Sequence, residues 1–201
     1  MIVKICGLTN LEDALAAVEC GATALGFNFY PASPRYIRPE QAARIIEHLP
    51  EAVWKVGVFV DAPPEEINRI RSLAGLDIVQ LHGNESPEMT LLVGRAWKAL
   101  RVEAGFTPAR FEPYRVEAFL LDAPCETYGG SGCTFDWNLA RGAGRPIVLA
   151  GGLDENNVRQ AIRTVRPWGV DACSRLESAP GRKDHARMAR FVKAALAEEN
   201  L

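Results

Sequence analysis

Two side chains with acid–base chemistry stand at the ends of apolar runs in this sequence. Cys6 closes the run 2–6 and is followed at once by Gly7, while Asp122 follows Phe119-Leu120-Leu121. A thiol with a lowered pKa, as near a helix N-terminus, acts as a base or nucleophile. A carboxylate that ends a buried strand is costly unless it is paired or used. The alternatives are a small buried hydrophobic residue for Cys6 and a loop cap for Asp122.

Glycine-rich turns after later apolar runs predict a phosphate site. Gly151-Gly152 follows one run, the segment Tyr128-Gly129-Gly130-Ser131-Gly132 follows another, and Ser174 comes shortly after a third. Backbone N–H groups in such turns can bind an anion. We therefore assign Gly130, Gly151, Gly152 and Ser174 to phosphate binding.

Four other polar residues are candidates for substrate contacts. Arg35, within Ser33-Pro34-Arg35, is either a solvated surface arginine or a fork for a substrate carboxylate. Gln80, His82 and Asp171 also lie at the ends of apolar runs and are assigned to substrate binding, with a capping role as the alternative for Asp171. Lys4, two residues before the cysteine, is expected to form an ion pair inside the fold.

Eight apolar runs rich in β-branched residues alternate with helical patterns. The predicted strands are 2–6, 24–29, 54–60, 77–81, 97–100, 118–121, 146–149 and 168–172. The predicted helices are 10–20, 39–48, 64–74, 87–93, 108–114, 136–141, 154–164 and 184–198. Such alternation predicts an α/β fold, a single (β/α)8 TIM barrel over residues 1–201, with its active site at the C-terminal ends of the strands. A doubly wound open sheet competes, but no G-x-G-x-x-G follows the first strand.

The predicted helix 10–20 carries two local signals. Thr9 and Glu12 have the spacing of a capping box, which places the start of the helix. Leu11, Ala14, Leu15 and Val18 form one stripe that would pack on the sheet.

Composition excludes several classes of protein. A net charge of -2 gives no reason to expect nucleic acid or a membrane surface as partner, and no apolar run is long enough to span a membrane. Five cysteines without a C-x-x-C spacing indicate a reduced, cytoplasmic protein. Three dispersed histidines form no local metal motif. The sequence leaves a homodimer open.

A set of motifs in a fixed order carries a family resemblance. They are Lys4-Ile5-Cys6-Gly7, Gly26-Phe27 with Ser33-Pro34-Arg35, Val58-Phe59-Val60-Asp61, Val79-Gln80-Leu81-His82-Gly83, Leu121-Asp122, Gly129-Gly130-Ser131-Gly132 with Phe135-Asp136-Trp137, Leu149-Ala150-Gly151-Gly152-Leu153 and Gly169-Val170-Asp171. Together they resemble phosphoribosylanthranilate isomerase. The resemblance implies an Amadori rearrangement of N-(5-phosphoribosyl)anthranilate to 1-(2-carboxyphenylamino)-1-deoxyribulose 5-phosphate in tryptophan biosynthesis, without metal or organic cofactor. It also implies that Cys6 is the general base, Asp122 the general acid and Arg35 the holder of the anthranilate carboxylate.

The chemistry of this reaction asks for opposite protonation states in the two catalytic groups. The acid protonates the ribose ring oxygen, and the base then removes the proton on C2 to form an enolamine. Cys6 must therefore have a lowered pKa, while Asp122 must have a raised pKa or receive its proton when substrate binds.

The sequence departs from the family pattern after the last predicted strand. Many members read Val-Ser-Ser-Gly-Val-Glu there, whereas this chain reads Ala172-Cys173-Ser174-Arg175-Leu176-Glu177. Arginine adopts a positive φ less readily than glycine, and we expect Arg175 to point to solvent. Two alternatives remain open. One is another phosphosugar enzyme on the same barrel, such as the related histidine-pathway isomerase or indole-glycerol-phosphate synthase, and the other is a non-catalytic barrel that binds a phosphorylated ligand.

Overall fold

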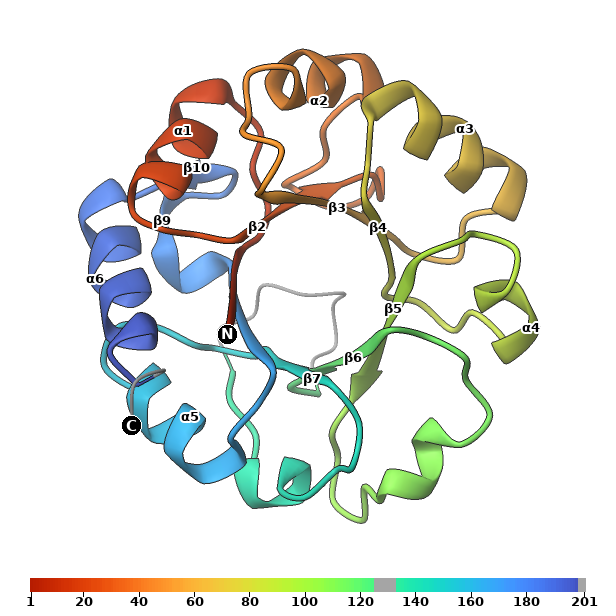
Figure 1. Ribbon diagram of the computed structural model, residues 1–201, viewed down its shortest axis with the longest axis vertical. Helices are drawn as coiled ribbons and strands as arrows, with labels where there is room; N and C mark the ends of the chain where they lie inside the picture. The colour runs from red at the N-terminus through yellow and green to blue at the C-terminus, as the bar shows by residue number, and fades with distance from the viewer. Residues whose placement is uncertain (125–132, 199–201) are drawn as a thin grey trace.

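Eight short parallel strands form the centre of the molecule. The computed structural model describes residues 1–124 and 133–198. Its strands close into a barrel in sequence order, because β1 pairs with both β2 and β8 (Figure 1). They are β1 (Ile2–Ile5), β2 (Ala24–Asn28), β3 (Trp54–Phe59), β4 (Ile78–Leu81), β5 (Ala96–Arg101), β6 (Ala118–Asp122), β7 (Ile147–Leu149) and β8 (Gly169–Ala172). The predicted (β/α)8 barrel is confirmed, and its closure rules out the open sheet.

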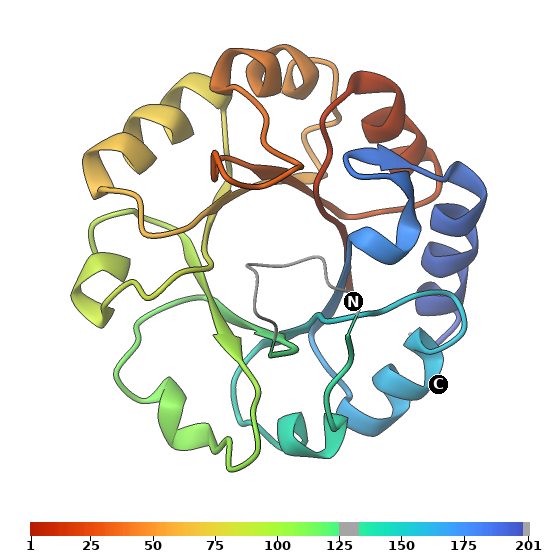
Figure 2. The same ribbon diagram turned by 180° about the vertical axis from the view of Figure 1, so that it is seen from behind.

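Helical segments surround the ring of strands on its outside (Figure 1 and Figure 2). They are α1 (Leu11–Glu19), α2 (Pro39–Ile46), α3 (Pro64–Ala74), α4 (Pro87–Thr90), α5 (Val158–Val165) and α6 (His185–Leu196). The fifth and sixth predicted helices are only short 3-10 segments, η1 (Pro108–Phe111) and η2 (Trp137–Ala140). Three small elements follow β8 that the sequence did not predict: η3 (Ser174–Leu176) and a hairpin of β9 (Glu177–Ala179) and β10 (Arg182–Lys183). The hairpin lies beside α1 (Figure 1).

Apolar side chains on the two faces of the strands pack into two layers. The larger layer, which includes Phe27 and Phe119, joins the strands to the helices. The smaller layer fills the barrel interior around Trp97, a fully buried residue, with Val56 and Leu120 among its neighbours. Burial on both faces explains why the strands read as nearly continuous apolar runs. The interior layer closes the barrel below the polar side chains at the strand ends.

The start of α1 corrects two details of the sequence analysis. Asn10 caps the helix rather than Thr9, because the Asn10 Oδ1 accepts a hydrogen bond from the backbone N–H of Asp13 at 2.9 Å. The Thr9 hydroxyl instead donates to a carbonyl between β9 and β10 at 2.6 Å. Leu15 of the predicted stripe is exposed, whereas Ala17 is fully buried. Small side chains on the inner face let α1 approach its neighbours closely.

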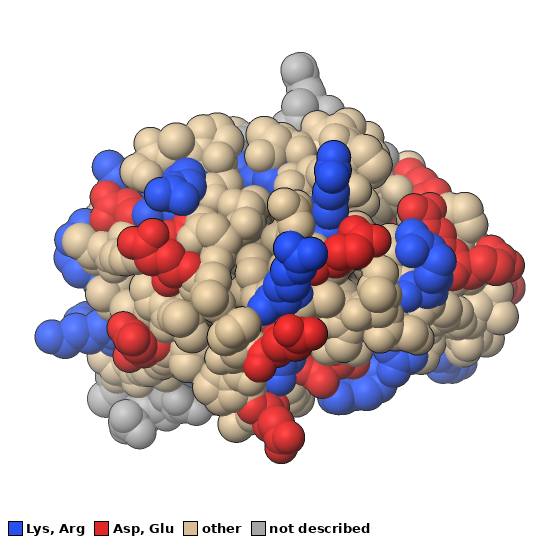
Figure 3. All heavy atoms as spheres, turned by 90° about the horizontal axis from the view of Figure 1, so that it is seen from above, with Lys and Arg blue, Asp and Glu red and all other residues tan. Residues whose placement is uncertain are grey.

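Acidic and basic side chains are interspersed on the side of the molecule shown in Figure 3. With a net charge of -2 over the whole chain, this mixture creates no large field of one sign on that side. Within the described ranges, no helix is both long enough and apolar enough to cross a membrane.

Candidate active site

A pocket opens at the C-terminal ends of the strands, where barrels of this kind place their chemistry. It encloses about 750 Å3 of space, part of it open solvent. It is lined by all nine predicted site residues that the structure describes: Cys6, Arg35, Gln80, His82, Asp122, Gly151, Gly152, Asp171 and Ser174. The tenth, Gly130, lies outside the described residues. The pocket therefore unites side chains that are up to 168 positions apart, from Cys6 to Ser174.

A second thiol and two lysine ammonium groups lie near the Cys6 sulfur. The hydrogen bond with Cys173 lowers the pKa of Cys6 well below its usual value, and Lys4 and Lys183 act in the same direction against the effect of burial. The same hydrogen bond raises the pKa of Cys173. The N-terminus of α1 does not adjoin the Cys6 thiol in sequence, because α1 begins only at Leu11. The neighbouring thiol and the lysines thus make Cys6 the thiolate of the pair.

Lys4 and Asp171 form the ion pair expected inside the fold. The Lys4 Nζ lies 2.8 Å from the Asp171 Oδ1, and the Lys4 side chain is fully buried. Burial raises the pKa of Asp171 to about 6 despite the attraction of Lys4. Burial also acts to lower the pKa of Lys4, but the attraction of Asp171 and Cys6 raises it overall. The close contact and the shift of Lys4 favour the charged pair at neutral pH, which keeps a cation beside the Cys6 thiolate.

Asp122 ends β6 and has two polar partners, the backbone of Ala123 and the His82 ring. Its Oδ1 accepts from the backbone N–H of Ala123 at 2.8 Å, and its Oδ2 lies 3.3 Å from the His82 Nε2. The Gln80 amide nitrogen, which can only donate, lies 3.0 Å from the His82 Nδ1. This contact makes Nδ1 the acceptor and directs the Nε2–H of His82 to Asp122. Among the described residues, no cluster of three His, Cys, Asp or Glu side chains could hold a metal ion.

The glycines after β7 form part of the pocket wall, and Gly151 lies beside Asp122. Gly151 and Gly152 both have a positive φ, 85° and 58°. A Cβ at Gly151 would lie 2.7 Å from the backbone nitrogen of Ala123, so a side chain there would displace the wall. Within the described part of the chain, the backbone N–H groups of Gly152 and Ser174 donate to no protein acceptor. Unpaired donors at a pocket wall suit an anion.

Arg35 lines the pocket but already has a carboxylate partner. Its Nε and Nη2 donate to the Glu177 carboxylate at 2.9 and 2.7 Å, and the residue is only 8% exposed. The solvated surface arginine considered above is therefore excluded. Glu177 occupies one edge of the guanidinium group, and Nη1 is the nitrogen that makes no contact with it. A role for Arg35 in holding a substrate carboxylate stays a prediction.

Comparison with known proteins decides the family. The sequence model described as N-(5'-phosphoribosyl)anthranilate (PRA) isomerase matches residues 3–194. The chain belongs to the N-(5'-phosphoribosyl)anthranilate isomerase family. The family member of Solibacter usitatus is 49% identical over 198 residues, which are 98% of each chain.

Two solved structures of this isomerase family share the fold as well as the sequence. One is a phosphoribosylanthranilate isomerase in complex with reduced 1-(o-carboxyphenylamino)-1-deoxyribulose 5-phosphate, at 45% identity and a TM-score of 0.88 over 98% of this chain and 100% of that chain. The other shows monomers generated from the dimeric phosphoribosylanthranilate isomerase of Thermotoga maritima, at 45% identity and a TM-score of 0.85 over the same shares of the two chains.

The departure from the isomerase family pattern at Arg175 leaves the backbone regular. In the described ranges, the non-glycine residues with a positive φ are Asp61 and Arg166. Arg175 is therefore not in the left-handed conformation that glycine favours. Its Nη1 donates to Asp154 Oδ2 at 3.0 Å, and its side chain is 44% exposed at the edge of the pocket. The solvent orientation we expected is met only in part, since Asp154 tethers the guanidinium group to the pocket rim.

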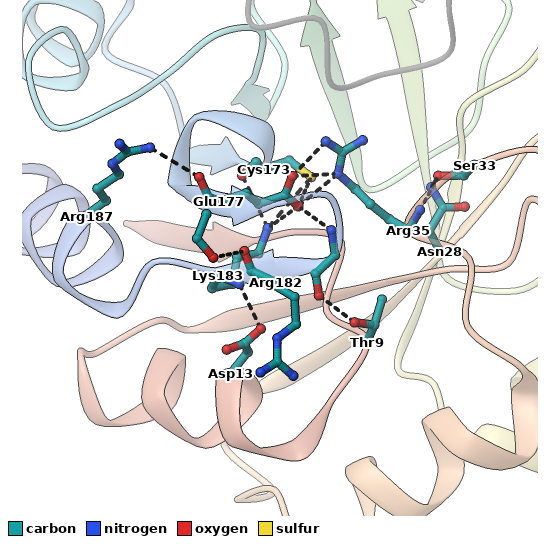
Figure 4. A network of polar contacts seen from close by, with 12 residues as sticks. Thr9, Asp13, Asn28, Ser33, Arg35, Cys173, Glu177, Arg182, Lys183 and Arg187 are labelled. Atoms are coloured by element: carbon teal, nitrogen blue, oxygen red, sulfur yellow. Dashed lines mark hydrogen bonds and ion pairs between the residues drawn. The ribbon is translucent and has the colours of Figure 1, made fainter.

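Two residues that neighbour the isomerase site were not predicted from the sequence. Glu177 accepts hydrogen bonds from Arg35 and, at 3.0 Å, from the Lys183 Nζ, so it joins the β2 loop to β10 (Figure 4). Cys173 contacts Cys6 and lines the pocket. Glu177 and Cys173 both lie within the segment that we compared with the family pattern, but their partners are distant in sequence.

Proposed function

We propose that this protein catalyses the Amadori rearrangement of N-(5-phosphoribosyl)anthranilate to 1-(2-carboxyphenylamino)-1-deoxyribulose 5-phosphate, an aldose–ketose isomerisation in tryptophan biosynthesis. The observation that supports it best is that Cys6, with its lowered pKa, and Asp122 line one pocket. Family membership and the related structure with a reduced form of this product support the same substrate.

The two ends of the substrate fit different parts of the pocket. The phosphate would bind the N–H groups of Gly152 and Ser174, next to Gly151. The anthranilate carboxylate would approach Arg35 from the side that Glu177 leaves open. Fixing both charged ends holds the ribose between the catalytic groups and converts the proton transfers into steps within one complex.

The reaction then needs two proton transfers by side chains of this chain. Asp122 gives a proton to the ribose ring oxygen, the bond between that oxygen and C1 breaks, and an iminium ion forms. The Cys6 thiolate takes the proton on C2, whose bonding electrons neutralise the iminium to give the enolamine. The enolamine tautomerises to the ketone. His82 positions Asp122 through the Nε2 contact at 3.3 Å.

A fluorescence assay tests the proposal directly. Purified protein in EDTA should abolish the fluorescence of phosphoribosylanthranilate with saturation kinetics. The phosphoribosyl substrate of the related histidine-pathway isomerase serves as the control and should turn over at least a hundredfold more slowly. If the protein bound phosphoribosylanthranilate without converting it, the proposal would be wrong and the protein would be a ligand-binding barrel.

We also propose that the protein is a cytoplasmic homodimer. Among the described residues, the thiols of Cys6, Cys20 and Cys173 form no disulfide, which is typical of a reducing compartment. The likeness to the Thermotoga maritima protein, which is dimeric, supports the assembly. Light scattering should give about twice the chain mass of 22.0 kDa, and the chain mass alone at micromolar concentration would refute the dimer.

A further inference from the structure

Cys6 and Cys173 occupy neighbouring positions at the ends of two paired strands. The parallel register of β1 and β8 runs from Ile2 opposite Gly169 to Ile5 opposite Ala172. Cys6 directly follows Ile5 at the end of β1, and Cys173 directly follows Ala172 at the end of β8. The Cys6 N–H donates to the Ala172 carbonyl at 2.9 Å. The pairing therefore continues by one residue and brings Cys6 opposite Cys173.

This placement fits the geometry of a disulfide. Neighbouring strands lie about 4.7–4.9 Å apart, and the Cα atoms of bridged cysteines are about 4.4–6.8 Å apart. Both side chains line the same pocket, and each thiol shifts the pKa of the other, so the two sulfurs lie on the same side of the paired strands. Gly7 leaves the space that Cys173 fills, because a Cβ at Gly7 would lie 2.8 Å from the Cys173 sulfur.

The pair also lies in the pocket, and one of its members is chemically activated. Both cysteines line the pocket, Cys173 as a half-buried residue and Cys6 as a buried one. Lys183 Nζ lies 3.9 Å from the Cys173 sulfur and forms a cluster with Glu177 and Arg35 (Figure 4). Lys183 and Lys4 act to lower the pKa of Cys6, and its thiolate is the form that reacts with oxidants. Cys20, whose pKa burial raises, lacks this setting.

We propose that Cys6 and Cys173 are a redox modification site, at which a peroxide converts the two thiols into a reversible disulfide. The Cys6 thiolate attacks the peroxide, the O–O bond breaks, and Cys6 sulfenic acid and hydroxide form. The Cys173 sulfur then displaces the sulfenic oxygen as water, with its own proton, and the S–S bond forms. The two sulfurs lose two electrons in total and the peroxide gains them. Loss of activity in the oxidised form rests on the proposed function, because it needs Cys6 as the base.

The bridge protects Cys6 as well as blocking it. A sulfenic acid that meets no second thiol is oxidised further to sulfinic acid, which ordinary thiols do not reduce. With Cys173 as its neighbour, Cys6 is instead held at the disulfide stage, from which a dithiol restores both thiols.

A variant that retains only this pair tests the proposal. Cys20, Cys125 and Cys133 are replaced by Ser, and the protein is treated with hydrogen peroxide, blocked with N-ethylmaleimide and mapped by mass spectrometry. We expect a linked Cys6–Cys173 peptide, two hydrogens lighter than its two parts. Activity should fall at least tenfold and return with dithiothreitol. The Cys173→Ser variant in the same background is the matched control: dimedone should label its Cys6, and prolonged peroxide should inactivate it without recovery.

Two results would overturn the disulfide. One is the absence of the linked peptide after peroxide treatment. The other is equal recovery by dithiothreitol with and without Cys173, each normalised to its own untreated activity. A linked peptide with full activity would leave the disulfide in place and remove Cys6 from the proposed mechanism.

Discussion

At the scale of single residues, the two proposed catalytic groups are held in different ways. The Cys6 thiolate is stabilised by a neighbouring thiol and by cations, whereas Asp122 is held by a hydrogen bond from Ala123 and by its contact with His82. Cys6→Ser and Asp122→Asn should each lower kcat by roughly 10²- to 10⁴-fold with little change in substrate affinity, since neither new group exchanges the proton. Single-turnover kinetics and equilibrium binding measure the two effects. Cys20→Ser is the control, and near-normal turnover in either catalytic variant would exclude that residue.

The reactivity of Cys6 can be compared with that of another cysteine in the same chain. The pKa of Cys6 is lowered by the hydrogen bond with Cys173 and by the lysines, while burial and Glu19 raise the pKa of Cys20. Iodoacetamide should therefore reach half its maximal rate at Cys6 below pH 9 and at Cys20 above pH 9, because only the thiolate reacts. Peptide mapping against pH gives both curves. Coincident midpoints would show that Cys6 is not activated.

Arg35 is the residue whose substitution should act mainly on KM. A charge-assisted contact with a carboxylate contributes about 1.5–3 kcal/mol, so Arg35→Ala should raise KM roughly tenfold or more. Lysine cannot form the two-nitrogen contact that Arg35 makes with Glu177, and Arg35→Lys should restore little. Arg175→Gly is the matched control, because Asp154 holds that guanidinium group at the rim. If Arg35→Ala and Arg35→Lys both kept the KM of the parent protein, Arg35 would not be part of the binding site.

At the scale of elements, the start of α1 can be tested for its cap, which is either Asn10 or the capping box of Thr9 and Glu12. Asn10→Ala should lower the free energy of unfolding by about 1 kcal/mol, because it removes the acceptor for the Asp13 N–H. Glu12→Ala should change it by less than about 0.5 kcal/mol, as expected for an exposed side chain without a capping role. Urea denaturation measures both. The reverse order would restore the capping box that spacing predicted.

Patterns within one element were predictable, and contacts between elements were not. Helix α3 has the predicted bounds because Pro64 and Gly75 mark its two ends. The hairpin β9–β10 has strands of only three and two residues, too short for an alternating pattern. The pocket was predictable because barrels place their active site at the C-terminal ends of the strands. The partner of Arg35 was not, because it lies 142 positions away in sequence and no local pattern indicates it.

At the scale of the whole molecule, we propose that residues 1–201 act as one domain, which the pairing of β1 with β8 supports. Glu177 connects distant parts of it. Burial disfavours its charge, but Arg35 and Lys183 outweigh burial and hold its pKa below the usual 4.5. The unfolded state therefore binds the proton more readily, so the stabilisation is complete above pH 4.5 and is lost as pH falls through the lower folded pKa.

Glu177→Gln should remove this pH dependence and destabilise the fold at neutral pH. Loss of the carboxylate leaves two cations without their partner, which costs about 3–5 kcal/mol for a buried pair. Thermal unfolding from pH 3 to pH 7 should show a smaller slope in the variant than in the parent protein. Parallel curves would show that other carboxyl groups cause the acid sensitivity. Glu117→Gln, at an exposed pair with Arg95, is the control.

The closure of the barrel sets the order of events during synthesis. Lys4 meets Asp171 at a separation of 167 positions, and the backbone N–H of Lys183 meets Asp13 at 170. At roughly 5–20 residues per second, the ribosome needs on the order of ten seconds or more to deliver those partners. Throughout that interval Cys6 has Lys4 beside it in the chain but lacks both Lys183 and the Cys173 thiol. On the proposed mechanism a nascent chain is therefore inactive until its last strand emerges, and the Cys6 thiol has all its partners only in the closed barrel.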